Sequence, residues 1–264
     1  MAVALAMGQP TWNKCVLGVT FLAANLLLVA HIWTLNDWAD RQTDEADPRK
    51  TCHVFTRKGV DPGTLLLLSL ALLGGSLTVF ALLSPTTFWI AIALVGLSAL
   101  YSVPGLRGKH TPLLSSLLHL AGGFFHFLSG YALFAAIDSH ALQIALVFGL
   151  TFTAGHGVQE LQDLEGDRRS GVRTNAVTFG KLPVFLVTLA AFLAIYAHIA
   201  ALAVAGVVPL RLGVPCVAIA GLHMRCALKA YRGGLSFESI RGYRWNYRIM
   251  FSILGVSGVS TVCY

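Results

Sequence analysis

Long apolar stretches alternate along the chain with short polar joints. A helix needs about 20 apolar residues to cross the hydrocarbon of a bilayer. Eight stretches reach or approach that length, and we predict a helix in each: residues 14–35, 63–83, 86–103, 112–137, 140–161, 183–207, 212–231 and 247–263. Turn-forming pairs such as Ser84-Pro85 and Gly233-Gly234 mark the joints. The pattern predicts an all-α, multi-pass transmembrane bundle, with residues 1–264 forming one domain.

The composition supports a membrane protein and excludes an ordinary soluble domain. The chain is 56% hydrophobic and 12% charged, with a mean hydropathy of +0.70, whereas soluble domains carry about 25% charged residues. Its five cysteines are scattered without a CxxC pair, so the sequence indicates neither a disulfide framework nor a zinc site. Residues 1–8 are apolar but too short to cross, and we expect either the remnant of a preceding span or a short disordered tail.

Basic residues fall almost entirely on one side of the predicted membrane. Eight spans place successive loops on alternate sides, and two basic residues, Lys14 and Arg211, then lie on one side. The other side receives seventeen of the nineteen: Arg41, Arg49, Lys50, Arg57, Lys58, Arg107, Lys109, Arg168, Arg169, Arg173, Lys181, Arg225, Lys229, Arg232, Arg241, Arg244 and Arg248. Loops rich in Lys and Arg stay cytoplasmic. This distribution predicts the orientation, and it accounts for the net charge of +7 without a nucleic-acid partner.

Two polar runs interrupt the apolar pattern at residues 36–44 and 159–169. Ten of the twelve acidic residues lie in these runs or in the loop after the first. Each run ends an apolar span, and both fall on the predicted cytoplasmic side. Carboxylates crowded at a membrane edge repel one another and lose hydration, so we expect a cation to hold them together. The runs therefore predict a divalent-metal site that handles an anionic, lipid-like substrate.

The spacing inside each run places oxygen donors on one face of a helix. The first run has three donors at i, i+4 and i+8: Asn36, Asp40 and Asp44. The second has three at i, i+3 and i+7: Glu160, Asp163 and Asp167. Mg²⁺ prefers oxygen ligands and often joins carboxylates to a substrate phosphate. Two facing sets predict Mg²⁺ ions around a diphosphate, where they would neutralise the charge of the leaving group.

Three motifs resemble those of the UbiA-type intramembrane prenyltransferases. Asn36-Asp37-x-x-Asp40-x-x-x-Asp44 is similar to the first aspartate-rich motif of that family. Glu160-x-x-Asp163-x-Glu165-Gly166-Asp167-Arg168 resembles the second, although its first position is glutamate where aspartate is common. Tyr101-Ser102-x-Pro104-x-x-Arg107-x-Lys109 resembles the loop between them. The order, spacing and topology agree over nearly the whole chain.

The resemblance implies a fold and a reaction. The family usually has nine spans around a central cavity, so the first span has no counterpart among the eight predicted here. It transfers a prenyl group from a prenyl diphosphate to a lipophilic or aromatic acceptor within the membrane, using Mg²⁺. The first donor set would hold one Mg²⁺ and the second another, with Asp40 and Asp163 central to catalysis. The candidates for diphosphate binding are Arg107, Lys109 and Arg168.

Aromatic and imidazole side chains are further candidates. The ring of Tyr101 would stabilise an allylic cation, or it simply packs in its loop. Four histidines would line the cavity, orient the acceptor or take its proton: His31, His119, His126 and His156. The alternative for each is a buried histidine bonded to a neighbouring helix. His156 with Glu160 also permits a transition-metal site, but no second HxxxE is available to complete it.

Two other functions remain open at this point. A membrane terpene cyclase of the same scaffold would ionise the same diphosphate and then let the cation attack its own chain. A transporter would belong to a different class of protein. Transporter sites usually lie near the bilayer midplane at the junction of repeats, whereas these charges lie at the membrane edge, so the transporter ranks third.

Overall fold

A computed structural model describes residues 2–8, 11–45, 55, 58–106 and 108–262. This part of the chain is all-helical, which confirms the predicted fold class. The long helices match the eight predicted spans: α2 (Trp12–Glu45), α3 (Pro62–Leu83), α4 (Pro85–Ser102), α5 (Leu114–Tyr131), α6 (Ser139–Arg169), α8 (Lys181–Val204), α9 (Gly213–Arg232) and α10 (Phe237–Val262). The short helices are α1 (Ala2–Met7), η3 (Gly108–His110), α7 (Asn175–Phe179) and η4 (Leu210–Leu212).

Within the described part of the chain, six long helices have the length and composition needed to cross a membrane, namely α2, α3, α4, α6, α8 and α9 with η4. The boundaries of α6 and α10, like the end of α2, differ from the predicted spans by eight to ten residues. Helix α6 continues to Arg169, and α10 already begins at Phe237. Apolar length defines only the part of a helix that faces lipid, whereas backbone hydrogen bonding continues into the polar residues beyond it. Both helices therefore project past their apolar segments.

Capping residues explain several helix ends. Asp61 precedes Pro62, and its side chain accepts a hydrogen bond from the Thr64 amide at 3.0 Å at the start of α3. Asp138 does the same for Ala141 at 2.7 Å at the start of α6. Such caps satisfy amides that have no partner within the helix. The joint predicted at Ser84-Pro85 is confirmed, because α3 ends there and α4 begins at the proline.

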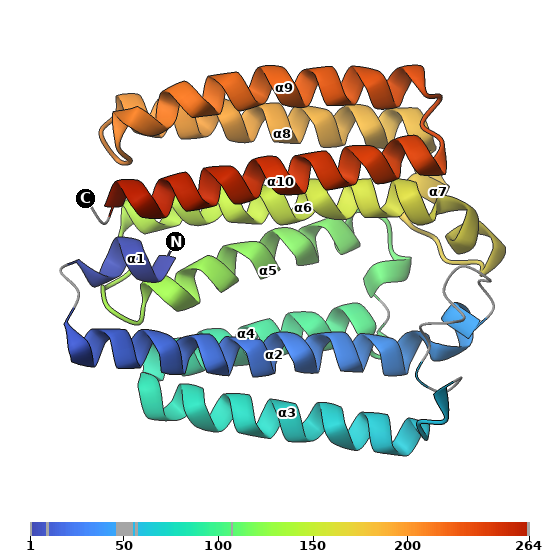
Figure 1. The fold of residues 1–264 in the computed structure, drawn as a ribbon. Coiled ribbons are helices and arrows are strands. Elements are labelled where there is room, and N and C mark those ends of the chain that lie inside the picture. The colour runs from blue at the N-terminus through green and yellow to red at the C-terminus, as the bar shows by residue number, and fades with distance from the viewer. Residues whose placement is uncertain (1, 9–10, 46–54, 56–57, 107, 263–264) are drawn as a thin grey trace.

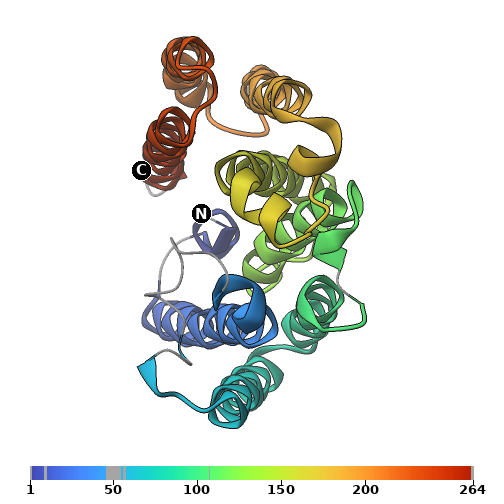
Figure 2. The ribbon, with the colours of Figure 1, turned by 90° about the vertical axis from the view of Figure 1, so that its right-hand side faces the viewer.

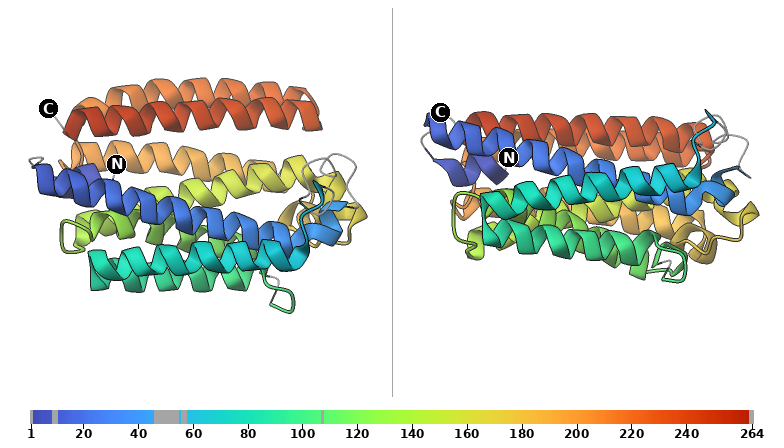
Figure 3. Two further views of the ribbon diagram at one scale, coloured as in Figure 1. Left: turned by 60° about the horizontal axis from the view of Figure 1, so that its bottom comes forward. Right: turned by 90° about the horizontal axis from the view of Figure 1, so that it is seen from below.

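The long helices form two groups of four. Helices α2, α3, α4 and α5 contact one another in chain order, while α6, α8, α9 and α10 form the second group (Figure 1). Helices α5 and α6 join the two groups. Figure 2 looks at the bundle from the end that carries α7, and Figure 3 shows that the long helices run side by side along one direction. The central cavity of the family stays a prediction.

Helices α5 and α6 approach closely because glycines face each other across their interface. A Cβ atom on Gly123 would lie 2.7 Å from the Phe148 carbonyl oxygen, and one on Gly149 would lie 2.7 Å from the Leu120 carbonyl oxygen. Gly123 therefore permits close helix contact. Its neighbour Gly122 has nothing within 4 Å of such a position. Only one member of the Gly122-Gly123 pair is required by packing.

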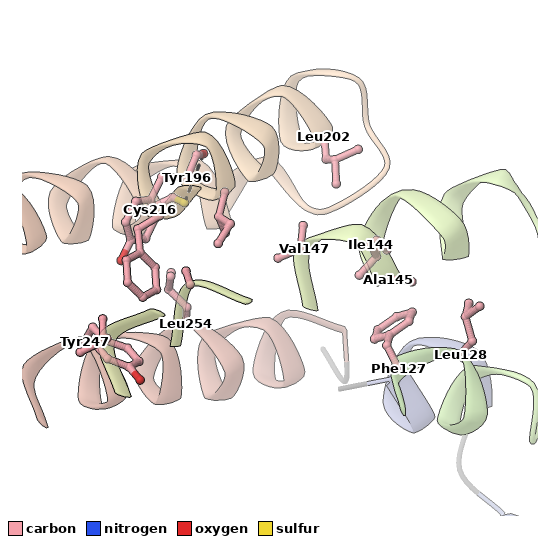
Figure 4. Close-up of a cluster of buried hydrophobic side chains, with 14 of the residues drawn as sticks. Phe127, Leu128, Ile144, Ala145, Val147, Tyr196, Leu202, Cys216, Tyr247 and Leu254 are labelled. Atoms are coloured by element: carbon pink, nitrogen blue, oxygen red, sulfur yellow. Dashed lines mark hydrogen bonds between the residues drawn. The ribbon is translucent and has the colours of Figure 1, made fainter. Parts of the chain in front are cut away.

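Apolar side chains from both groups of helices fill the core. Figure 4 shows Phe127 and Leu128 of α5 near Ile144 of α6, and Tyr196 of α8 near Cys216 of α9. Residues 2–7 form the short helix α1, which contacts α5 and α10. The expectation of a disordered tail is therefore wrong for these residues. Apolar side chains of this segment pack against the core, and their burial stabilises the helix.

Candidate active site

Both acidic runs lie at the same end of the bundle. Helix α2 continues through the first run to Glu45, and α6 continues through the second to Arg169. Because both runs are helical, the predicted i, i+3/i+4 spacings do place their donors along single helix faces. The C-terminal ends of α2, α4 and α6 gather with η3 and α7 at one end of the molecule (Figures 1 and 2). Helix ends that are far apart in sequence thus converge as predicted.

Lys109 in η3 connects the two acidic runs. Its ammonium nitrogen lies in direct contact with Asp40 of α2, and the side chains of both residues are largely buried. Burial lowers the pKa of Lys109 to about 8, although the negative charge of Asp167 of α6 opposes that shift. The Lys109 ammonium group therefore interacts electrostatically with a carboxylate from each run. This is the observation that brings the two motifs into one site.

The last turn of α4 lies against the first run. The Ser102 hydroxyl donates a hydrogen bond to Oδ1 of Asn36 at 3.2 Å. The neighbouring Tyr101 points toward the second run, where the charges of Glu160, Asp167 and Asp163 act on it. The loop motif is thereby held between the two acidic runs.

Tyr101 also belongs to an aromatic cluster with two of the predicted histidines. The rings of His119 and His156 stack with centroids 3.7 Å apart and planes 10° apart. The Tyr101 ring meets them edge to face, at 5.1 Å from His119 and 6.2 Å from His156. The Nδ1 atom of His119 lies 2.8 Å from the Ser115 carbonyl oxygen. The structure therefore brings together three candidates that the sequence could only place on separate helices.

The Glu160 carboxylate is buried among hydrogen-bond donors, with a relative exposure of 3%. Its Oε1 accepts from Asn175 Nδ2 at 3.0 Å and from the Ser115 hydroxyl at 3.3 Å. Its Oε2 accepts from the Ala176 amide at 3.3 Å. His156 Nε2 lies 2.9 Å from Oε1, which is within ion-pair distance. The angle between the two groups does not meet that of a hydrogen bond. The partners Ser115 and Asn175 were not predicted, because neither belongs to a motif.

Arg244 of α10 contacts the second run, which the sequence analysis did not predict. Its guanidinium donates to Gln162 Oε1 at 3.0 Å and to Gln159 Oε1 at 3.1 Å, and both glutamines belong to the second run. The charge of Asp163 also acts on Arg244. The sequence showed only that this arginine falls on the same side of the membrane as the acidic runs. The last helix therefore braces the second run.

Two predicted histidines lie apart from this cluster. His31 is buried between α2 and α3, and its Nδ1 lies 2.9 Å from both the carbonyl oxygen and the hydroxyl of Ser69. His31 thus follows the alternative of a histidine bonded to a neighbouring helix. His126 lies beside Phe152, with centroids 6.4 Å apart. Periodicity placed both on helix faces but could not show which helix those faces meet.

The remaining predicted residues are placed as follows. Asp44 lies near the end of α2, partly buried, and Asp163 and Asp167 are partly buried on α6. Arg168 is exposed in the last turn of α6. Arg107 lies outside the described residues. The metal, diphosphate and catalytic roles predicted for this set stay predictions.

The donor set suits a hard cation such as Mg²⁺. It consists of carboxylate and amide oxygens, which are the ligands that Mg²⁺ prefers, and the ammonium group of Lys109 already lies among them. Within the described ranges, no three His, Cys, Asp or Glu side chains are already grouped closely enough to hold an ion. The residues therefore fit a cation that also takes ligands from a bound substrate.

Comparison with known proteins agrees with this geometry. The model of the UbiA prenyltransferase family matches residues 1–237. The chain belongs to this family. A lycopene elongase/hydratase from Haloferax volcanii is 30% identical to this UbiA member over 240 residues, which cover 89% of the chain and 73% of the relative. The chain spans between 50% and 59% of the length of three further curated relatives.

Solved structures show the same fold at low sequence identity. A UbiA homologue from Aeropyrum pernix K1, solved in the apo state, has a TM-score of 0.76 at 18% identity, covering 97% of this chain and 94% of that one. A UbiA homologue from Archaeoglobus fulgidus, solved bound to GPP and Mg²⁺, has a TM-score of 0.64 at 15% identity and covers 93% and 92% of the two chains. The arrangement of helices is therefore that of the UbiA family.

Proposed function

We propose that this UbiA-family chain transfers a prenyl group from a prenyl diphosphate to a lipophilic acceptor within the membrane, with Mg²⁺ as cofactor. The observation that carries this proposal is the position of Lys109, which contacts Asp40 of the first run and feels Asp167 of the second. A diphosphate with its bound metal cation would therefore bind where the two runs meet. The Archaeoglobus fulgidus homologue was solved with GPP and Mg²⁺, which supports the choice of both.

In this proposal the acidic runs hold the metal and basic residues hold the diphosphate. Asn36, Asp40 and Asp44 would bind Mg²⁺ from one side and Asp163 and Asp167 from the other, and the bound metal would neutralise charge on the departing diphosphate. Lys109, Arg168 and Arg107 would grip phosphate oxygens.

The bond between C1 of the prenyl group and the diphosphate oxygen then breaks, and its electron pair leaves with the diphosphate. The Tyr101 ring, together with the stacked rings of His119 and His156, would face the allylic cation that remains. The acceptor forms the new carbon bond and loses a proton, which His119 or His156 would take. The packing of the three rings into one cluster supports this shared role.

The test is a reaction of the purified chain in lipid with Mg²⁺ and geranyl diphosphate. Two acceptors would be compared, an apolar polyene and a hydroxylated aromatic acid, because the Haloferax volcanii relative is named for lycopene. A prenylated acceptor in the mass spectrum supports the proposal. A cyclic hydrocarbon formed without acceptor would instead establish the terpene cyclase, and turnover that survives chelation of Mg²⁺ would remove the metal from the mechanism.

We also propose that the site faces the cytoplasm. In the topology predicted from the sequence, seventeen of the nineteen basic residues fall on the side that carries the acidic runs, and the side rich in Lys and Arg stays cytoplasmic. A single cysteine replacing the exposed Arg169 in a cysteine-free variant tests the side. An impermeant thiol reagent added to intact cells should leave it unlabelled and should label it after the membrane is opened. Labelling in intact cells would reverse the orientation.

A further inference from the structure

We propose that Asn175 is a positioning residue for diphosphate binding, because it links Glu160 to the turn that carries Lys109. The inference rests on the proposed function, since it assumes that Lys109 binds the diphosphate. Asn175 is the first residue of α7, and only 6% of it is exposed. We call Asn175, Glu160 and the Leu113 amide the latch.

The Asn175 side chain reaches two other helices at once. Its Oδ1 accepts a hydrogen bond from the Leu113 amide at 2.7 Å, just before α5. Its Nδ2 donates to Glu160 Oε1 of α6 at 3.0 Å, and it lies 3.2 Å from the hydroxyls of Ser115 and Ser116. If the Asn175 side-chain amide were flipped, its NH2 group would face the Leu113 N–H and its oxygen would face the Glu160 carboxylate, and neither pair could form a hydrogen bond. The polarity of both neighbours therefore fixes this orientation.

Leu113 occupies a backbone conformation that needs outside support. Its φ is +66° and its ψ is −43°, and positive φ is uncommon for residues other than glycine. Such conformations persist when the surrounding structure holds them. The 2.7 Å hydrogen bond to Asn175 is the contact that holds the Leu113 amide. Losing it would free the turn between η3 and α5.

The latch is anchored by Glu160. The carboxylate also accepts from the Ser115 hydroxyl and from the Ala176 amide, so it connects α6 to the first turns of both α5 and α7. These partners occupy both carboxylate oxygens. In this inference, therefore, Glu160 acts through the latch, and the sites for Mg²⁺ on the second run are Asp163 and Asp167.

A tight contact transmits the position of this turn to Lys109. The neighbouring Gly108 packs so closely that a Cβ atom there would lie 2.7 Å from Leu118 Cδ1 and 2.9 Å from the Leu100 carbonyl oxygen. The η3 turn therefore rests directly on α4 and α5. Because Leu113 immediately precedes α5, a change in the latch moves the support on which Lys109 sits. The path runs from Glu160 through Asn175 and Leu113 to Lys109.

A double-mutant cycle tests this path. We expect Asn175→Ala to raise the KM for geranyl diphosphate about 5- to 30-fold, the size of an interaction between coupled residues. In a Lys109→Ala background the same substitution should change KM less than about twofold, because the group that it positions is gone. An equal effect in both backgrounds would show that Asn175 does not act through Lys109.

Ser76→Ala provides the matched control. Ser76 is fully buried, and its hydroxyl donates a hydrogen bond to the Ala24 carbonyl oxygen at 2.9 Å between α3 and α2. The substitution therefore removes a comparable interhelical hydrogen bond at another place in the bundle. Its effect on KM should be small and the same in both backgrounds. Should Asn175→Ala fail to insert, Asn175→Asp replaces it. That variant keeps the side-chain volume and the acceptor for Leu113 but repels Glu160, so the same non-additivity is expected.

Hydrogen exchange without substrate separates the latch from the proposed function. The amides of residues 113–116 should exchange faster in Asn175→Ala than in the wild-type chain and should be unchanged in Ser76→Ala. Faster exchange with a KM that neither Asn175→Ala nor Lys109→Ala alters would retain the latch but refute diphosphate binding by Lys109. Unchanged exchange would refute the latch itself, whatever the KM values.

Discussion

Lys109 of η3 lies in direct contact with the carboxylate of Asp40 of α2, and the charge of Asp167 of α6 acts on the same ammonium group. Two acidic motifs that are distant in the sequence thus share one basic side chain. The lysine offsets the repulsion that carboxylates at one membrane edge would otherwise feel. It also holds a positive charge where an anionic substrate would bind.

The carboxylates of the two runs should be essential for turnover. We expect Asp40→Asn and Asp163→Asn each to lower the rate of diphosphate release about 100-fold or more. Each carboxylate would help to hold the metal whose charge stabilises the departing diphosphate, and loss of such stabilisation has that scale. The rate is measured with labelled prenyl diphosphate in lipid. Glu238→Gln is the matched control, because that exposed carboxylate lies at the start of α10 beside Arg241. Full activity in either aspartate variant would remove the proposed metal role.

Diphosphate binding should weaken as the pH rises above about 8. Burial lowers the pKa of Lys109 to about 8 while Asp167 opposes the shift, so the ammonium form predominates below that pH and is lost above it. We expect the KM for prenyl diphosphate to rise about tenfold between pH 7.5 and 9.5, as a charged contact is lost. Lys109→Arg should flatten the profile because arginine stays protonated.

The same shift affects stability in the opposite direction. The unfolded chain binds this proton more tightly than the folded one, with an ordinary pKa of 10.5. The contribution of Lys109 to stability should therefore increase between pH 8 and 10.5. For the preceding prediction, a KM for prenyl diphosphate that stays constant between pH 7.5 and 9.5 in the wild-type chain would contradict the role given to the ammonium group.

Adjacent glycines of α5 should respond differently to the same substitution. Gly123→Ala should lower the free energy of unfolding by about 1–3 kcal/mol, because a methyl group there meets the backbone of α6 and forces the helices apart. Gly122→Ala should be tolerated, since nothing lies within 4 Å of its Cβ position. Thermal unfolding in detergent measures both variants. Equal melting temperatures would show that the α5–α6 interface is looser than described.

Two histidines should separate stability from activity. His31 joins α2 to Ser69 of α3, so His31→Ala should destabilise the fold by about 1–3 kcal/mol through the lost buried hydrogen bonds and keep the KM of the folded fraction. His119 packs against His156 and Tyr101, so His119→Ala should lower kcat about tenfold or more. Unfolding curves and single-substrate kinetics measure the two effects. The reverse pattern would exchange the roles of these residues.

The sequence by itself determined the helices, their order and the end of the bundle that holds the polar runs. Apolar length and helical spacing are local properties, so residues 36–44 and 159–169 could be placed on helix faces on one side of a membrane. It also gave the motifs that resemble the UbiA family, and the family match over residues 1–237 confirmed that membership. Local pattern was less informative at α10, whose first two turns mix charged residues with the buried Ile240 and Tyr243.

Only the tertiary structure decided which faces meet. His31 and His119 both lie within apolar segments of the sequence, yet one contacts Ser69 and the other stacks on His156. Glu160 belongs to a motif, but its carboxylate meets Asn175, which belongs to none. These contacts depend on how each helix is rotated and how closely it crosses its neighbours. Spacing along one helix places a side chain on a face, and the packing of the other helices determines what that face contacts.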